Sequence, residues 1–207
     1  WMSASSTAWY SLAIGSGALA TTPTSGAALY NTAVGMLSPL GANTTGTFNS
    51  AFGAQALRLN TTGSYNTANG VNALYANTTG NENTANGVSA LESNTTGANN
   101  TVVGRNTLYY NGSATNTVAV GTLAAQGTGA YSNQGGTYIG YASGFNAATG
   151  SDYNTLLGFQ SGYGITTGAR NVLLGQSTIA ASYNQVTTGS NNIAIGNDVA
   201  VPSATAS

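Results

Sequence analysis

The sequence predicts an all-β fold, a parallel β-solenoid or β-roll of about eleven coils with a repeat of about 17 residues. Three observations support this prediction. A short strand-like motif that ends in glycine recurs along nearly the whole chain, the tetrapeptide NTTG recurs at a fixed interval, and no segment has sustained apolar residues at helical spacing. A repeat of this length is too short for a helix pair or a propeller blade, but it suits one coil of a solenoid.

The strand-like motif is exemplified by NTAVG at Asn31–Gly35, in which small or β-branched residues alternate as in a short strand. In the regular repeats it leads into GxxAL, as at Gly53–Leu57, whose Ala and Leu we expect to point inward. The motifs predict one solenoid domain over residues 11–201, with a lead-in or contact segment at 1–10 and a C-terminal tail at 202–207. They close on Gly15, Gly35, Gly53, Gly70, Gly87, Gly104, Gly121, Gly140, Gly158, Gly175 and Gly196.

The NTTG tetrapeptide begins at Asn43, Asn60, Asn77 and Asn94, each 17 residues after the last. Asparagine in first place and glycine in fourth predict a type I turn, with positive φ at the glycine. Stacked coils place equivalent residues about 4.8 Å apart, where side-chain amides form a hydrogen-bonded ladder. We therefore predict one ladder at Asn43, Asn60, Asn77, Asn94 and Asn111, and a second at Asn49, Asn66, Asn83 and Asn100.

Charged residues make up 3% of the chain, and the net charge is −1. This composition provides no basic patch for nucleic acid and no polybasic segment for an anionic membrane. The longest apolar stretches fall far short of the ~20 residues that span a bilayer. We therefore expect neither a nucleic-acid partner nor membrane insertion.

Catalytic equipment is sparse, because the sequence contains no His, Lys or Cys. The only carboxylates on side chains are those of Glu82, Glu92, Asp152 and Asp198. Glu82 and Glu92 occupy different positions of the repeat, so we expect them to face different sides. General acid–base and nucleophilic catalysis both need a paired titratable group, so the sequence predicts no enzyme, no catalytic or metal site and no cofactor.

The same asparagines belong to N-x-[ST] sequons and are candidate glycosylation sites. If their turns are exposed, glycans would line one edge of the rod, although an Asn- and Thr-rich turn also generates sequons by chance. A flat ice-binding array is disfavoured, because the strand motif carries one Thr rather than Thr-x-Thr. The six sequons begin at Asn43, Asn60, Asn77, Asn94, Asn99 and Asn111.

The second half of the chain is enriched in tyrosine and contains an irregular Gly-, Ser- and Gln-rich loop at Gln126–Gly136. Aromatic side chains of this kind line glycan-binding strips, but they also cover thin cores or subunit contacts, and we favour the contact. The tyrosines concerned are Tyr109, Tyr110, Tyr131, Tyr138, Tyr141, Tyr153 and Tyr163.

Two parts of the chain resemble known families. NNIAIGNDVAV (Asn191–Val201) and SLAIGSGAL (Ser11–Leu19) are similar to the head repeats of trimeric autotransporter adhesins of the YadA type. NTANGVNALYANTTG, which begins at Asn66, resembles the repeat region of bacteriophage tail fibres that carry an endosialidase-type chaperone. The resemblance implies a parallel β-roll fibre, commonly trimeric, that extends or binds and does not catalyse.

A coil of about 17 residues encloses a thin core of Ala, Val and Leu, which favours completion by other copies of the chain. We expect a homotrimer or a head-to-tail filament, with Trp1, Trp9 and Tyr10 in a contact. The predicted function is a self-assembling structural subunit of an extracellular fibre, on a cell surface or virion. The alternative is an adhesin head that binds a receptor or glycan through the Gln126–Gly136 loop and the tyrosines.

Overall fold

The computed structural model describes residues 10–21, 30–176 and 188–197. Within these ranges the chain forms eleven strands of three residues each and no helix, so no described helix crosses a membrane. The strands are β1 (Leu12–Ile14), β2 (Thr32–Val34), β3 (Ser50–Phe52), β4 (Thr67–Asn69), β5 (Thr84–Asn86), β6 (Thr101–Val103), β7 (Val118–Val120), β8 (Thr137–Ile139), β9 (Thr155–Leu157), β10 (Val172–Leu174) and β11 (Ile193–Ile195).

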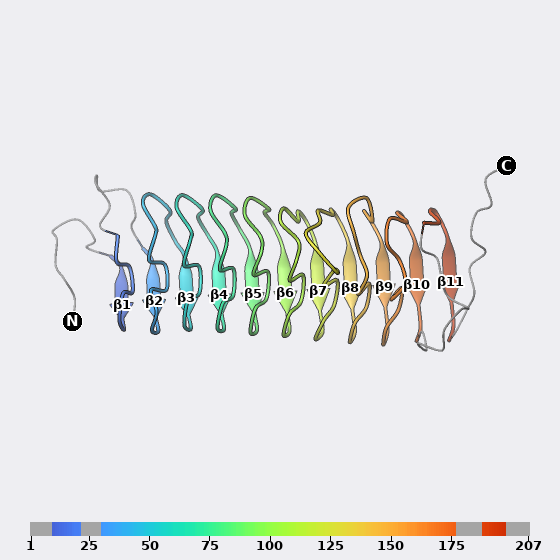
Figure 1. The fold of residues 1–207 in the computed structure, drawn as a ribbon, viewed down its shortest axis with the longest axis horizontal. Coiled ribbons are helices and arrows are strands. Elements are labelled where there is room, and N and C mark those ends of the chain that lie inside the picture. Colours follow the sequence, from blue (N-terminus) through green and yellow to red (C-terminus); the bar gives the residue numbers. More distant parts are fainter. Residues whose placement is uncertain (1–9, 22–29, 177–187, 198–207) are drawn as a thin grey trace.

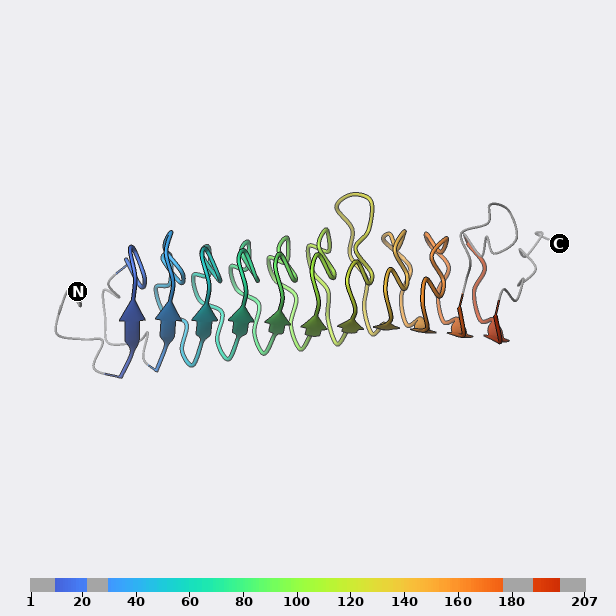
Figure 2. The same ribbon diagram turned by 90° about the horizontal axis from the view of Figure 1, so that it is seen from below.

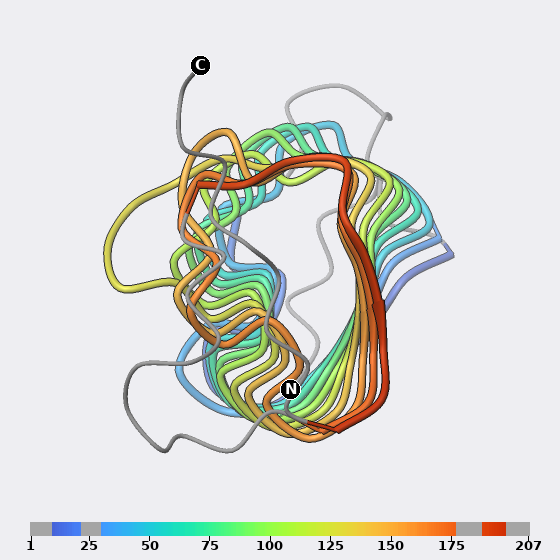
Figure 3. The ribbon, with the colours of Figure 1, turned by 90° about the vertical axis from the view of Figure 1, so that its right-hand side faces the viewer.

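The eleven strands form one parallel sheet whose strand order follows the sequence. Each strand pairs with the equivalent residues of the next coil, as Ala51 pairs with Ala68 and Ala68 with Ala85. Figure 1 shows the strands in a single row along a rod, and Figure 3 shows the coils superimposed with a gradual rotation. The all-β parallel solenoid predicted from the sequence is confirmed.

The core lies between the sheet and the opposite wall of each coil. The middle residue of a strand faces inward, so Ala68 is fully buried while Thr67 and Asn69 are exposed. The opposite wall contributes the Ala-Leu pair of GxxAL, as at Ala73 and Leu74, which are also fully buried. The predicted inward orientation of this pair is confirmed.

Two consecutive residues face inward because the backbone turns sharply at the leucine. Leu74 has a φ of 52°, and the same coil has positive φ at Tyr65 (60°) and Asn72 (58°). Non-glycine residues adopt this left-handed region only sparingly. Here three such residues recur in each regular coil, and the sequence did not reveal them.

The closing glycines are required by both conformation and space. Gly70 has a φ of 141°, and a Cβ built there would lie 2.4 Å from the carbonyl oxygen of Gly87 in the next coil. Equivalent close approaches occur at Gly53 and Gly87. Any other residue at these positions would push neighbouring coils apart.

The first predicted amide ladder is confirmed from Asn43 to Asn94. The Nδ2 atoms of Asn60, Asn77 and Asn94 donate to the Oδ1 atom of the preceding asparagine over 3.0, 2.8 and 3.0 Å. Asn111 does not belong to this ladder, because it donates to Asn133 Oδ1 instead. Asn94 Oδ1 is therefore buried without a hydrogen-bond partner in the described part of the chain.

The second ladder is confirmed, and the same amide contact recurs in the last coils. Asn66, Asn83 and Asn100 each donate to the preceding asparagine over 2.8 to 3.2 Å. Beyond β9 the same position again carries asparagines, and Asn171 and Asn192 donate over 3.1 and 2.9 Å. Amide contacts of this kind therefore hold coils together near both ends of the described rod.

The turn predicted for NTTG is wrong in one respect, because its glycine does not have positive φ. Instead, the asparagine side chain donates to the glycine carbonyl, as in Asn60 Nδ2 to Gly63 O at 2.9 Å. A Cβ at Gly63 would lie 2.3 Å from Gly80 O and 2.4 Å from Asn60 Oδ1. The glycine is therefore required by close packing between coils.

The coils that contain β8 and β9 fill the same cross-section differently. Tyr138 replaces alanine at the strand centre, and its ring fills the space beside Gly136 and Gly144, where a Cβ would approach it to 2.2 and 2.6 Å. In the next coil Leu156 packs against Gly162 in the same way. The large side chain has moved from the opposite wall to the sheet.

Candidate functional site

The asparagines that head the NTTG repeats hold the fold and do not form a binding surface. Asn43, Asn60, Asn77, Asn94 and Asn111 are all buried, with exposed fractions of at most 1%. Their Nδ2 atoms donate to neighbouring carbonyl or amide oxygens. The expected exposed row of sequons is therefore wrong for these five positions, because a glycan on a buried Nδ2 atom does not fit this fold.

Asn99 is the exception among the six sequons. It lies immediately before the inward-facing Asn100, has a φ of 60°, and is exposed. Its backbone N–H donates to Asn81 O at 3.1 Å. Asn99 thus remains a candidate glycosylation site, and the structure leaves its side chain accessible.

The Gln126–Gly136 loop projects from the rod between β7 and β8, as Figure 2 shows. Only its tip, Thr128–Ala130, is continuously exposed. Tyr131 folds back into the core and donates its hydroxyl to the Ala125 carbonyl. The loop therefore covers the coil rather than presenting an aromatic side chain to solvent.

Two of the seven predicted tyrosines cannot bind a ligand at the surface, because Tyr131 and Tyr138 are buried. Burial raises the pKa of both hydroxyls above the usual 10.0. Tyr138 Oη accepts from Asn133 Nδ2 at 2.8 Å and donates to Ser151 O at 3.2 Å. The alternative in which the tyrosines bind a glycan is therefore wrong for these two, which instead fill the thin core.

The other five tyrosines are exposed or partly buried, but they lie on several sides of the rod. Tyr141 stacks on Phe159 at 5.2 Å, while Tyr163 stacks on Phe145 at 4.9 Å. Tyr153 lies under the guanidinium of Arg170 at 5.8 Å. Tyr109 contacts Tyr110 edge-to-face at 4.6 Å. These side chains form separate pairs rather than one strip.

The most regular exposed feature is a row of aromatic rings that sequence analysis missed, apart from its first member. Tyr10, Tyr30, Phe48 and Tyr65, which we call the aromatic row, stack with ring centroids 5.0, 4.9 and 5.0 Å apart. The planes of neighbouring rings differ by only 15°, 3° and 8°. Each ring is 46–64% exposed.

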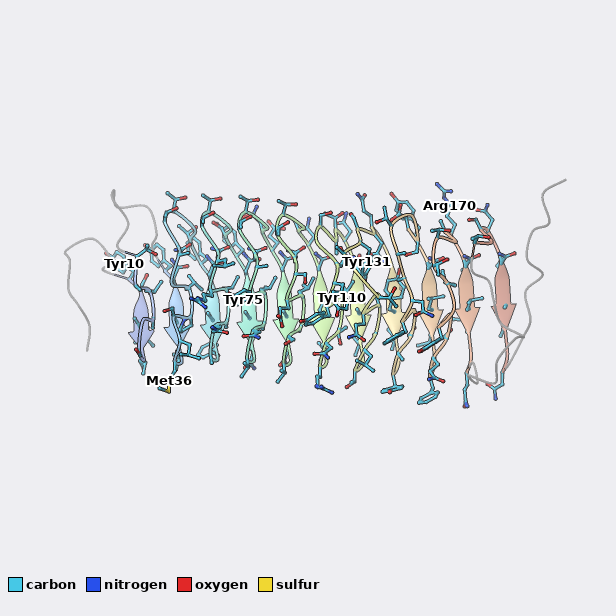
Figure 4. The ribbon with its side chains drawn as sticks, viewed as in Figure 1. Tyr10, Met36, Tyr75, Tyr110, Tyr131 and Arg170 are labelled. Carbon is cyan, nitrogen blue, oxygen red and sulfur yellow. The ribbon has the colours of Figure 1, made fainter. Side chains whose placement is uncertain are left out.

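Each ring of the aromatic row occupies the same position of its coil, two residues before the first residue of the strand. The dipeptides YN at Tyr30 and Tyr65 and FN at Phe48 repeat at this position. The repeated position of these aromatic residues was a usable sequence signal, but the outward direction of their side chains depends on the positive φ at the ring residue. Tyr10 was predicted to lie in a contact; it stacks on Tyr30, and Figure 4 shows it at the N-terminal end of the rod. Trp1 and Trp9 lie outside the described residues.

The few charged side chains in the described part of the chain are dispersed. Glu82 is exposed one coil after Tyr65, whereas Glu92 is partly buried and accepts a hydrogen bond from Tyr109 Oη at 3.3 Å. The charge of Glu92 raises the pKa of Tyr109. Asp152 Oδ1 accepts from the Gln134 N–H at 2.9 Å, and Asp198 lies outside the described residues. No group of three or more potential metal ligands occurs among the residues described.

Comparisons of this chain with protein-family models, with curated proteins and with solved structures find no match. The architecture and its surfaces are therefore the basis for considering function.

Proposed function

We propose that this chain is a self-assembling structural subunit of an extracellular fibre or filament, on a virion or a microbial surface, with no catalytic role. The observation that carries the proposal is the in-register stacking of eleven strands along one axis. A chain that adds one coil per repeat gains length with each coil and little width. Such a molecule is suited to reach and rigidity.

Rigidity is supported by bonds that cross every boundary between the regular coils. Besides the two amide ladders, the first threonine of each NTTG donates its hydroxyl to a carbonyl of the next coil, as in Thr61 Oγ1 to Thr78 O at 3.0 Å. Thr78 repeats this contact to Thr95 O at the same distance. Bending the rod would have to distort several such rows together.

End-to-end assembly is supported by the two edge strands of the sheet, β1 and β11. In the preceding coils the N–H of the first strand residue donates to the next coil, as Val172 does to Asn192 O at 2.8 Å. The equivalent N–H at Ile193 points where a further coil would lie, and no described residue accepts from it. Unpaired strand edges are templates for pairing with another chain.

Lateral assembly is supported by the outer face of the sheet. Parallel sheets normally have both faces covered, yet this face is exposed in the described chain. Toward both ends it carries exposed apolar side chains, including Ile14, Leu157 and Ile193, whereas β4 and β5 carry Thr and Asn. A homotrimer packed through this face would bury the apolar part.

Negative-stain electron microscopy and sedimentation velocity test the proposal directly. We expect fibres, or rods of trimeric mass, from the purified chain. Ile193→Pro removes the edge N–H at a position where proline is tolerated, and Leu157→Lys charges the apolar face. At least one of these changes should reduce assembly, whereas Thr84→Lys on the polar part of the face should not. A stable monomer at micromolar concentration would contradict self-assembly.

A receptor- or glycan-binding head is the alternative function, and one observation favours it. The aromatic row exposes four rings that the core does not need. Exposed aromatic side chains are common where proteins bind other molecules. This alternative is compatible with a fibre, because a rod can present such a row along its length.

A further inference from the structure

We propose that the aromatic row Tyr10–Tyr30–Phe48–Tyr65 binds an extended, uncharged polysaccharide that lies parallel to the rod axis. The proposal locates the binding surface that the alternative function requires and goes beyond the fibre role. It assigns attachment to the N-terminal coils, whereas the Gln126–Gly136 loop and its buried Tyr131 carry no part of it.

The backbone does not require aromatic residues at this position. Tyr30, Phe48 and Tyr65 have φ values of 61°, 57° and 60°, in the left-handed region that Gly and Asn tolerate best. Later coils place different residue types at the equivalent position, namely Asn99, Asn116, Gly135 and Asn191 but also Glu82, Tyr153 and Arg170. The local conformation thus does not select aromatic residues, yet they occupy this position in four consecutive coils, and departures from local preference are typical of functional positions.

The core does not require the rings either. They extend away from the buried Ala and Leu side chains and remain 46–64% exposed, although each stacks on a neighbour. A row of this kind presents a continuous strip of ring edges, one ring per coil at steps of 4.9–5.0 Å. The rings repeat at a constant interval, so a ligand can offer every ring the same chemical group only if the ligand is itself periodic.

Hydroxyl groups flank part of the strip on both sides. Immediately before the rings in sequence lie Thr47 and Ser64, partly buried and joined through Thr47 N to Ser64 Oγ at 3.0 Å. On the sheet side, Thr32, Ser50 and Thr67 point outward, and Thr67 is exposed. A pyranose chain combines apolar C–H faces with hydroxyl groups, so it complements rings bordered by neutral hydrogen-bonding groups.

Charge and backbone bonding argue against other polymers. Within the described residues from Tyr10 to Tyr65 the only charged side chain is Arg58, and its guanidinium lies over the ring of Tyr75, 5.9 Å from the centroid. An anionic chain such as nucleic acid would therefore lack cationic partners. An added peptide strand would need free backbone groups, but the N–H of Tyr65 already donates to Thr47 O at 2.9 Å. A neutral polysaccharide needs neither.

The test uses the full chain, with cellohexaose and chitohexaose as probes and tyrosine fluorescence and calorimetry as readouts. The triple variant Tyr30→Asn, Phe48→Asn, Tyr65→Asn removes three rings and inserts the residue that the fold uses at Asn99, so the coils are preserved. Tyr153→Asn is the matched control, because Tyr153 occupies the equivalent position (φ 58°) outside the row. Circular dichroism checks that both variants are folded.

We expect at least one hexasaccharide to bind the unmodified chain and to bind the triple variant at least about tenfold more weakly, as the loss of several aromatic contacts implies. Tyr153→Asn should bind as the unmodified chain does. The proposal is overturned if neither probe binds at millimolar concentration, or if the triple variant binds equally well. It is also overturned if the triple substitution alters only sedimentation, because the row would then be a contact between copies. None of these outcomes changes the expected rod, so failure here is distinguishable from failure of the fibre proposal.

Discussion

Two regions of the rod fill the same cross-section in opposite ways. One consists of the regular coils, which contain β4 and β5, and the other of the coils that contain β8 and β9. The regular coils place Ala68 and Ala85 on the sheet and Leu74 and Leu91 on the opposite wall. The later coils place Tyr138 and Leu156 on the sheet, where Gly144 and Gly162 stand opposite. The large residue can therefore stand on either wall of the coil, provided that a small residue stands opposite.

The two regions also differ at the position that the first asparagine of NTTG occupies in the regular coils. In the regular coils Asn77 Nδ2 donates to Asn60 Oδ1, but Ala147 and Ile165 occupy the equivalent position in the later coils. Both replacements are buried, and their N–H groups keep the same backbone bond, as Ile165 does to Gly162 O at 3.0 Å. Hydrophobic packing therefore substitutes for an amide ladder without changing the backbone path.

The largest expected effect comes from breaking the ladder in the regular region. Asn77→Ala leaves Asn60 Oδ1 buried without its donor and removes the acceptor of Asn94 Nδ2. We expect the free energy of unfolding, measured by urea denaturation, to fall by about 3–4 kcal/mol. Thr79→Ala is the control, since Thr79 is exposed in the same turn and should change stability by less than about 0.5 kcal/mol. Equal effects from the two changes would show that the ladder adds little.

The next prediction is a pH dependence of stability that arises from the region near β8. Tyr131 and Tyr138 are buried near β8, and burial raises both pKa values above the unfolded value of 10.0. The unfolded chain therefore loses these protons first as pH rises. Stability is fully present below pH 10 and falls above it, by about 2 kcal/mol between pH 10 and 11 for two fully shifted groups.

Urea denaturation at pH 9, 10 and 11 measures this dependence. The double variant Tyr131→Phe, Tyr138→Phe should be less stable at pH 9, because it loses the hydroxyl bonds to Ala125 and Asn133. It should, however, lose less stability between pH 10 and 11 than the unmodified chain. An unchanged slope in the double variant would assign alkaline destabilisation to other groups.

An effect of similar size measures how the two walls of a coil share the core volume. Ala68→Leu overfills a regular coil and Leu74→Gly empties it, so each change alone should destabilise the chain. Together they reproduce the Leu156 and Gly162 arrangement. We expect the double variant to be more stable than additivity predicts by about 2 kcal/mol in a double-mutant cycle. Strict additivity would mean that the two walls do not share one packing volume.

The sequence predicted the repeat, the parallel stacking and the amide ladders because these depend on spacing alone. A fixed interval of 17 residues aligns Asn60 with Asn77 whatever path the coil takes between them. The inward Ala-Leu pair was also predictable from its apolar character. None of these features requires knowledge of the backbone angles.

The features that sequence analysis missed depend on those angles. Positive φ at Leu74 and Tyr65 sets which side chains face inward and which form an exposed row. The burial of Tyr138 depends on Gly136 and Gly144, which are separated in the sequence and both lie against its ring. The same limit explains why the sequons were expected to be exposed. The pattern NTTG predicts a turn, but it does not show that the asparagine side chain points into the coil.

The smallest expected effect on stability concerns glycosylation, which separates exposed from buried sequons within the regular region. A glycan attached to Asn60 or Asn77 would occupy a side chain that the ladder buries completely, so molecules modified there should not fold. Asn99 is exposed and one residue away from the ladder position Asn100. Modification at Asn99 should therefore leave the free energy of unfolding within about 0.5 kcal/mol of the unmodified value.

Secretion from a host with an oligosaccharyltransferase, followed by peptide mapping of the folded fraction, tests this expectation. We expect any glycan in folded molecules at Asn99 and none at Asn43, Asn60, Asn77, Asn94 or Asn111. Asn99→Gln should remove the glycan without altering the melting temperature, because Asn99 contributes no side-chain bond that the ladders need. Folded molecules that carry a glycan on Asn77 would contradict the buried ladder itself, since its Nδ2 atom cannot both bear a sugar and donate to Asn60 and Gly80.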